Sequence, residues 1–545
     1  MVKDMLDKCY MGVFRRINYC VNFFISNKKE LPDKFGKWFY YHDSKCKVIK
    51  HDDKITIYHG YVIDAQSIEH HIVSDSLKSH TNGNFFAVTM HKDRLEVIVD
   101  FFSQHKIFYR DDGERLEVSN KIFLFPFVSS DIDNRQLYKT KREALMKNHM
   151  PLDTNSVDRM ERYRSRRGKD KQSTAPMFLT RGNRHTGTIF KHTFILPTYH
   201  SLELTDKSKV TKQTDLVALN YKNLFAEESP LSHSEVEDIV FHSMEGHADI
   251  IKQTYRNIVS SVSEGVDSIL QDCFFPDAEK ITYTYDPPAT TDRYKRDYLE
   301  RYASDKVHWD TFPVSDQKSI TKEVANDPEA DFFDTLPTTW QVKKYKGAID
   351  VLLYGQMGDN MFLHHPWYTY TFMMAKLNED STSSIEQKLM NYKRELEKIR
   401  SCYSSRETLD GPEYHSYNAR FDIDNTADLE IVLAQFGSDW KQNVAQAIVP
   451  STYTRDLIHS CDVPVVSLYA DKRIFNLVHS CGYDIVESNM REAQTQKNIL
   501  QNRFDYRFIT PVKDGAYFNM HEMVTPWYLR TVEHCMKDHL LELCK

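Results

Sequence analysis

A small polar loop between an apolar strand and a helix is the first candidate for chemistry. The segment IVSSVSEGVDSIL, residues 258–270, runs through Ser263, Gly265, Asp267 and Ser268. Backbone N–H groups at a helix N-terminus point outward, and the helix dipole there favours anions. The serine hydroxyls can donate to phosphate oxygens, the glycine allows close approach, and the carboxylate can hold Mg²⁺. The pattern predicts a phosphate-binding loop; an ordinary capped strand–turn–helix is the alternative.

A second strand-end loop carries a further carboxylate. Residues 351–368 read VLLYGQMGDNMFLHHPWY, in which an apolar strand precedes Gly355, Gln356, Gly358 and Asp359. Glycine is scarce, at 17 of 545 residues, so these two glycines are informative. Since ligands bind outside the carboxyl ends of strands in open parallel sheets, we expect Asp359 to face the carboxylate of the first loop. Two carboxylates on one Mg²⁺–pyrophosphate would be ordinary magnesium chemistry.

Together the two loops resemble motifs of the asparagine synthetase family. The first resembles SGGxDS, the pyrophosphate-binding loop of ATP pyrophosphatases, and the second resembles the GEGxDE segment of asparagine synthetases. Residues 511–518, PVKDGAYF, resemble the family's Lys-x-x-Phe segment. The resemblance implies ATP binding by Ser263, Gly265, Asp267, Ser268, Tyr285, Gly355 and Gly358. It implies Mg²⁺ binding by Asp267 and Asp359, and catalytic positions at Lys513 and Gln356.

The N-terminal text resembles the class II glutamine amidotransferase domain of the same family. The segments that carry this resemblance are HGYVI at 59–63, GNFFAV at 83–88, and Asp100 with the hairpin that follows it. The family's nucleophile is a cysteine at residue 2, whereas this sequence has Val2, and His59 replaces the oxyanion-hole asparagine. We therefore expect an inactive, structural domain. β-Lactam synthetases and lasso-peptide cyclases are similar in architecture and also lack glutaminase activity.

The resemblance implies an AMP- and pyrophosphate-forming amide ligase, with asparagine biosynthesis as the reference activity. A small-molecule or peptide carboxylate would attack ATP, and ammonia or an amine would then take the acyl group. Glu264, Gln356 and Asn360 depart from the family motifs. Glu264 adds negative charge beside the phosphates, and like charges 4 Å apart repel by roughly 4 kcal/mol at an effective dielectric of about 20. Gln356 cannot act as a general base. A catalytically inactive relative with a binding or structural role is the alternative.

The elements that must position these loops fall into three zones. Residues 1–35 are predicted to be a helical extension with an amphipathic helix at 9–26. Residues 36–215 are predicted to form the amidotransferase-like domain, with a basic insertion at 137–185. Residues 216–545 are predicted to form the ATP-binding domain. The expected fold class is α/β with an α+β N-terminal domain: an N-terminal nucleophile hydrolase-like sandwich, then a parallel-sheet ATP-pyrophosphatase domain with a helical C-terminal part.

Short runs rich in β-branched and aromatic residues predict the individual strands. In the first domain these lie at 38–41, 55–63, 85–91, 95–101, 106–109 and 116–119, with further strands in 186–209. In the second domain, strands are predicted at 280–285, 307–311 and 348–354, and a helix that runs into a strand is predicted over 233–261. Further helices are predicted at 292–303, 384–401 and 528–543.

Composition excludes several classes of protein. The chain has 71 basic and 78 acidic residues, a net charge of −7, so no bulk positive charge drives it onto nucleic acid. The basic run at 159–171 leaves a nucleic-acid contact open, with an exposed loop as the plainer interpretation. Nine cysteines without zinc-type spacing indicate a reducing compartment, and the absence of a run of ~18 apolar residues predicts no membrane span. We expect a cytoplasmic protein, and a homodimer is compatible with the resemblance.

Overall fold

The computed structural model describes residues 22–28, 31–127, 131, 188–212, 229–285, 307–312, 338–404, 423–436 and 463–506, with short internal gaps that include 264, 356 and 363–372. The helices predicted at 292–303 and 528–543, the basic insertion at 137–185 and residues 1–21 lie outside these ranges. Among the described helices, none has both the length and the apolar character needed to cross a membrane.

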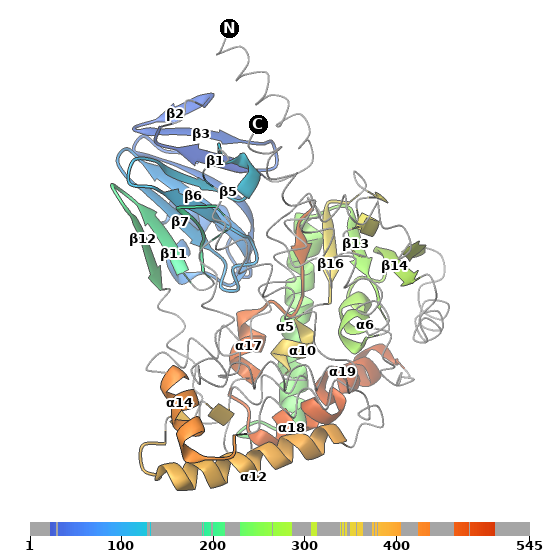
Figure 1. Cartoon of the computed structure of the whole chain (residues 1–545). Helices are drawn as coiled ribbons and strands as arrows, with labels where there is room; N and C mark the ends of the chain where they lie inside the picture. Colours follow the sequence, from blue (N-terminus) through green and yellow to red (C-terminus); the bar gives the residue numbers. More distant parts are fainter. Residues whose placement is uncertain are drawn as a thin grey trace.

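Two antiparallel sheets, each of six strands within the described residues, form the N-terminal part of the chain (Figure 1). The strands of the first sheet are β1 (Phe23–Ser26), β2 (Asp33–Phe35), β3 (Trp38–His42), β8 (Phe108–Asp111), β9 (Leu116–Ser119) and β10 (Thr193–Ile195). The strands of the second are β4 (Lys47–Lys50), β5 (Lys54–Val62), β6 (Gly83–His91), β7 (Leu95–Val99), β11 (His200–Leu204) and β12 (Ser208–Lys212). Their orders are β10-β8-β9-β1-β3-β2 and β12-β11-β7-β6-β5-β4.

A shared hydrophobic core holds the two sheets face to face. In β6, Phe86 and Val88 enter this core, whereas Phe85 and Ala87 join a second cluster on the opposite face. This period of two is the side-chain alternation of a strand. Phe23 of the first sheet meets Phe86 of the second with 5.0 Å between ring centroids. Among the described residues of this part there are also three short helices: α2 (Ile68–Val73), η1 (Leu77–Ser79) and η2 (Ile122–Leu124).

The helix predicted over residues 9–26 is wrong at its C-terminal end. Phe23–Ser26 form β1, which pairs with β3 on one side and with β9 on the other. All four residues of β1 are buried. A strand buried on both faces shows no polar–apolar alternation, so its sequence pattern cannot be told from that of a buried helix. The β-rich part therefore includes residues before the predicted boundary at residue 36.

A parallel sheet, of five strands within the described residues, follows in the chain. Its strands are β13 (Ile258–Ser261), β14 (Glu279–Tyr285), β15 (Val307–Phe312), β16 (Val351–Tyr354) and β17 (Val465–Val466). The order is β15-β14-β13-β16-β17. The chain steps outward from β13 to β15 and then returns to place β16 on the other side of β13. This confirms the predicted parallel sheet and creates a topological switch point between β13 and β16.

Within the described residues, eight helices contribute to the large hydrophobic core that includes residues of this sheet. They are α5 (His233–Thr254), α6 (Val266–Cys273), α10 (Gly358–Met361), α12 (Ile385–Ser404), α14 (Thr426–Phe436), α17 (Lys472–Val478), α18 (Tyr483–Glu492) and α19 (Gln494–Phe504). Helix α5 begins with a capping box, in which the Ser232 hydroxyl accepts from Glu235 N and the Glu235 carboxylate accepts from Ser232 N. Such reciprocal bonds satisfy N–H groups that the helix leaves unpaired.

Buried polar contacts join the two parts. The Tyr61 hydroxyl of β5 lies 2.8 Å from His247 Nε2 of α5. Asn82 donates to Asp471 Oδ1 and accepts from Lys472 N, at the start of α17. Asn84 of β6 donates to the carbonyl of β17 residue Val465 at 3.1 Å. The β5–β6 region is therefore fixed directly to the edge strand of the parallel sheet.

Candidate functional site

The two loops singled out from the sequence lie together at the switch point. The first follows β13 and the second follows β16, and these strands are parallel neighbours whose pairing ends with Ser261 opposite Tyr354. Both loops therefore leave the sheet at the same edge, side by side. Crevices at this position are where open α/β sheets bind their ligands.

Close packing of glycines brings the loops into contact. A Cβ atom on Gly355 would lie 2.7 Å from Ser268 Cα, closer than real Cβ atoms come. A Cβ atom on Gly358 would overlap Cγ and Oδ1 of Asp267. Between these glycines, Met357 has φ 92°, a conformation that L side chains rarely adopt and that costs about 1–3 kcal/mol. The second loop therefore has a strained backbone at Met357, and its glycines contact Asp267 and Ser268 of the first loop.

The serines of the first loop share a hydrogen-bond network. The hydroxyls of Ser263 and Ser268 lie 2.8 Å apart, and Ser268 Oγ also lies 3.0 Å from Gly265 O. Ser263 Oγ accepts from Gly265 N at 3.2 Å, and Ser268 Oγ accepts from Ser263 N. Ser263 and Gly265 are exposed, whereas Ser268 is buried. The loop presents one accessible hydroxyl above the first turn of α6, whose N–H groups lack intrahelical partners.

Two residues from distant parts of the chain fix Asp267. Gln496 of α19 donates from Nε2 to Asp267 Oδ1 at 2.9 Å, and the Tyr469 hydroxyl donates to the Asp267 carbonyl at 2.9 Å. Gln496 is fully buried, and its Oε1 has no hydrogen bond within the described residues. Gln496 is not among the site residues predicted from the sequence, although residues 496–500 resemble a helix start of the asparagine synthetase family. The hydrogen bond from Gln496 orients Oδ1 of Asp267, and the Asp267 carboxylate lies at the switch point between β13 and β16.

The remaining predicted site residues are placed only in part. Asp359 belongs to α10 directly after Gly358, and Tyr285 ends β14 next to β13; the side chains of both lie outside the described residues. Gln356 and Lys513 lie outside the described residues altogether, as does Glu264. The structure therefore brings together Ser263, Gly265, Asp267, Ser268, Gly355 and Gly358. The roles of Asp359, Tyr285, Gln356 and Lys513 stay predictions.

The N-terminal part has a buried polar network near its contact with the parallel sheet. Asp100 Oδ1 accepts from Phe102 N, and Asp100 Oδ2 accepts from Gln104 N, both at 3.0 Å. Gln104 Oε1 accepts from Asn84 Nδ2, and Asn84 Oδ1 lies 2.8 Å from His105 Nε2. Burial raises the pKa of Asp100 to about 7, although these hydrogen bonds oppose the shift. Asp100 is therefore a carboxyl group that titrates near neutral pH.

Asp100 should make stability fall as pH rises. Between pH ~4 and ~7 the folded state holds more protons on this carboxyl than the unfolded state, so the free energy of unfolding decreases across that window. The loss amounts to roughly 2–3 kcal/mol between pH 5 and 8 for a pKa of about 7 against the ordinary value of about 3.9. Urea unfolding of Asp100→Asn at both pH values should lack this loss. Asp93→Asn, at an exposed acid, is the control. The same dependence of the unfolding free energy on pH in wild type and Asp100→Asn would contradict the raised pKa of Asp100.

The three cysteine thiols that the structure describes are poor nucleophiles. Burial raises the pKa of Cys46 well above its ordinary value, and Asp43 adds to the effect. Burial likewise raises the pKa of Cys273 and of Cys481 to about 12 in each case. The thiolate is the reactive form of cysteine, and its population at neutral pH is very small for such pKa values. In β5, burial lowers the pKa of the His59 imidazole to about 4, so this ring is neutral at neutral pH.

Comparison with known proteins gives little beyond the geometry. No protein-family model matches the chain, and no curated protein sequence matches it. One matching solved structure is described as the allosteric regulatory enzyme of purine biosynthesis. It is 8% identical, with a TM-score of 0.19, and the match covers 54% of this chain and 75% of that chain. A likeness at that score carries no argument about fold or function.

Proposed function

We propose that the chain is an ATP-dependent amide ligase of asparagine synthetase type that releases AMP and pyrophosphate. The observation that carries this proposal is the meeting of two glycine-containing loops around Asp267 at the switch point of a parallel sheet. In the same proposal, the parallel sheet belongs to an ATP-pyrophosphatase-type domain. The paired antiparallel sheets belong to an amidotransferase-like domain of N-terminal nucleophile hydrolase type.

The chain's own residues suit a phosphate and its metal. Exposed Ser263 and the first turn of α6 offer donors to phosphate oxygens, and Gly265 adds no side chain between them. Asp267 supplies an oxygen ligand of the kind that Mg²⁺ prefers, and Gln496 holds its orientation. Mg²⁺, when bound, would neutralise charge on the leaving pyrophosphate. Asp359 is proposed as the second carboxylate for that metal, and Tyr285 as a wall of the adenine pocket.

The proposed reaction has two steps. A carboxylate oxygen of the acid substrate attacks the α-phosphorus of ATP, and pyrophosphate leaves. Ammonia or an amine then attacks the acyl carbon, loses a proton, and displaces AMP to leave an amide. Lys513 is proposed to stabilise negative charge that develops in these steps. Gln356 cannot take the proton of the amine, so the proposal needs a nucleophile that arrives neutral or another base.

Ammonia rather than glutamine is the proposed nitrogen donor. The three cysteines whose side chains the structure describes, Cys46, Cys273 and Cys481, have raised pKa values, so none of these three supplies the thiolate that glutamine hydrolysis requires. A suitable test incubates the full chain with Mg²⁺, ATP and L-aspartate, with either ammonium or glutamine, and identifies the nucleotide products. AMP and pyrophosphate should form with ammonium and not with glutamine. Formation of ADP and phosphate would contradict the proposed bond cleavage.

The second candidate is a catalytically inactive nucleotide-binding relative. The hydrogen bonds inside the first loop favour it, because Ser268 Oγ already lies within bonding distance of the carbonyls of Ser263 and Gly265. A phosphate must compete with these contacts. Nucleotide binding without AMP formation, for any acid supplied, would support this candidate over the ligase.

A further inference from the structure

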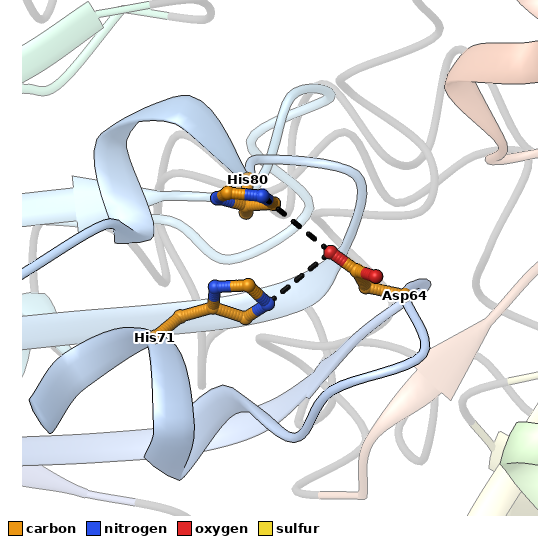
Figure 2. Close-up of side chains that lie close together, drawn as sticks. All are labelled: Asp64, His71 and His80. Atoms are coloured by element: carbon orange, nitrogen blue, oxygen red, sulfur yellow. Dashed lines mark ion pairs between the residues drawn. The ribbon is translucent and has the colours of Figure 1, made fainter. Parts of the chain in front are cut away.

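The connection between β5 and β6 brings three metal-binding side chains together, far from the switch-point loops in sequence. Asp64 follows β5, His71 lies in α2, and His80 directly follows η1. Figure 2 shows the two imidazole rings stacked, with the carboxylate beside them. The ligand atoms of these three side chains all lie within 4.8 Å of one another. Within the part of the chain that the structure describes, no other group of three or more His, Cys, Asp or Glu side chains lies so close together.

The distances between the ligand atoms suit a shared metal ion. Asp64 Oδ2 lies 3.2 Å from His71 Nε2 and 3.6 Å from His80 Nε2. Two ligands bound to zinc at 2.0–2.1 Å in a tetrahedral arrangement are separated by roughly 3.3 Å. The two separations from Asp64 are therefore close to the spacing that a tetrahedral metal requires. The stacked rings must turn on binding so that both Nε2 lone pairs point at one ion.

A single residue supports both imidazoles from behind. His71 Nδ1 lies 2.9 Å from Ser76 Oγ, and His80 Nδ1 lies 2.9 Å from Ser76 O. A carbonyl oxygen only accepts hydrogen bonds, so His80 Nδ1 carries a proton and directs the lone pair of a neutral ring from Nε2 toward Asp64. Metal-ligating histidines typically donate their other ring N–H in this way. Ala65 N donates to Asp64 Oδ1, which leaves Oδ2 for the histidines.

His71 gives an independent sign that a cation belongs here. His71 is 2% exposed, and its buried Nε2 makes no hydrogen bond among the described residues apart from its ion-pair contact of 3.2 Å with Asp64. The Ser76 hydroxyl beside Nδ1 can donate or accept, so the ring can carry its proton on Nδ1 and keep the Nε2 lone pair for a metal. In that tautomer, a cation between the three ligand atoms would be coordinated by both imidazoles and by the carboxylate.

We propose that Asp64, His71 and His80 form a zinc site, with water in the fourth position. Two imidazoles and one carboxylate are a known ligand set for zinc, and such three-ligand sites keep an open position. The Asp64 and His80 side chains are about one-third exposed, so solvent reaches that position. The same connection ends at Asn82, which is bonded to Asp471 and Lys472. The site would therefore stabilise a segment that docks on the C-terminal part, independently of the ligase activity.

Titration of the metal-free full chain with Zn²⁺ tests this proposal. Wild type should bind one Zn²⁺ per chain through this site, with a rise in melting temperature. His80→Ala and Asp64→Asn, at the exposed ligands, should each lose at least ~100-fold in affinity. Ser76→Ala, which removes only the support of His71, should lose about 10–100-fold. His70→Ala is the matched control, since His70 lies in the same helix and is exposed.

Co²⁺ gives a second readout that identifies the ligands. Bound Co²⁺ should show visible ligand-field bands without thiolate charge-transfer absorption, and His80→Ala should abolish them. This separates the site from zinc bound by cysteines elsewhere in the chain. His71→Ala removes a buried ring, so the exposed variants keep the test decisive even where this one fails to fold. Equal Zn²⁺ affinity in wild type, His80→Ala and Asp64→Asn would overturn the proposal, as would no binding in wild type.

Discussion

Replacing Asp267 with asparagine should lower ATP-dependent pyrophosphate release by about 10³-fold, equivalent to about 4 kcal/mol of transition-state stabilisation. Asparagine keeps an oxygen that can accept from Gln496, so the hydrogen bond at 2.9 Å and the local fold should survive. What it removes is the negative charge. In the proposed reaction that charge binds Mg²⁺ on the pyrophosphate group of ATP, so the loss should appear both in the binding of Mg·ATP and in turnover.

A matched acid tests whether this effect is specific to the site. Asp277 lies in the exposed turn beyond the other end of α6, and Asp277→Asn should keep wild-type activity. Unfolding in urea should show similar stabilities for both variants and wild type. Full activity in Asp267→Asn would contradict the proposed role of this carboxylate, since the fold at the loop would be unchanged.

Gly358→Ala should reduce the same activity by about 10²-fold without a change in any charged or catalytic group. The added Cβ would overlap the Asp267 side chain, so that side chain must move by about 1 Å to regain normal contact. A displacement of this size at reacting groups can cost 10²-fold. The melting temperature should fall as well, because Gly358 is buried in the contact between the loops.

The chain offers a matched glycine for comparison. Gly246 lies inside α5, and a Cβ atom built there meets nothing within 4 Å. Gly246→Ala should therefore leave activity unchanged and raise stability by about 0.5–1 kcal/mol, the usual gain for alanine over glycine within a helix. Equal activities for the two glycine variants would mean that the contact between Gly358 and Asp267 does not position the site.

Local patterns predicted much of the secondary structure. Strand β9 has the bounds expected from the sequence, and the strand predicted at 55–63 is β5 to within one residue. The helix that runs into a strand over 233–261 is confirmed as α5 and β13. These elements have strong periodicity or clear turn residues at their ends. Strand β1 was missed because it is buried on both faces, where period alone does not separate strand from helix.

The sequence predicted the candidate loops better than their surroundings. Strand–helix alternation indicated a parallel sheet, but the placement of β16 beside β13 depends on non-local pairing that no short window contains. Gln496 reaches Asp267 across 229 residues, so only folding shows the contact. The cluster of Asp64, His71 and His80 was not predicted from the sequence, because the spacing of these residues matches no short metal-binding motif. A helix and a 3₁₀ turn bring these residues together.

The central claim is that the switch-point loops bind Mg·ATP, and equilibrium titration of the full chain with ATP tests it most directly. Wild type should bind ATP more tightly in the presence of Mg²⁺ than in its absence. Asp267→Asn should lose most of that metal-dependent gain, and Asp277→Asn should keep it. Equal affinity with and without Mg²⁺ in wild type, unchanged by Asp267→Asn, would contradict the account, as would the absence of nucleotide binding.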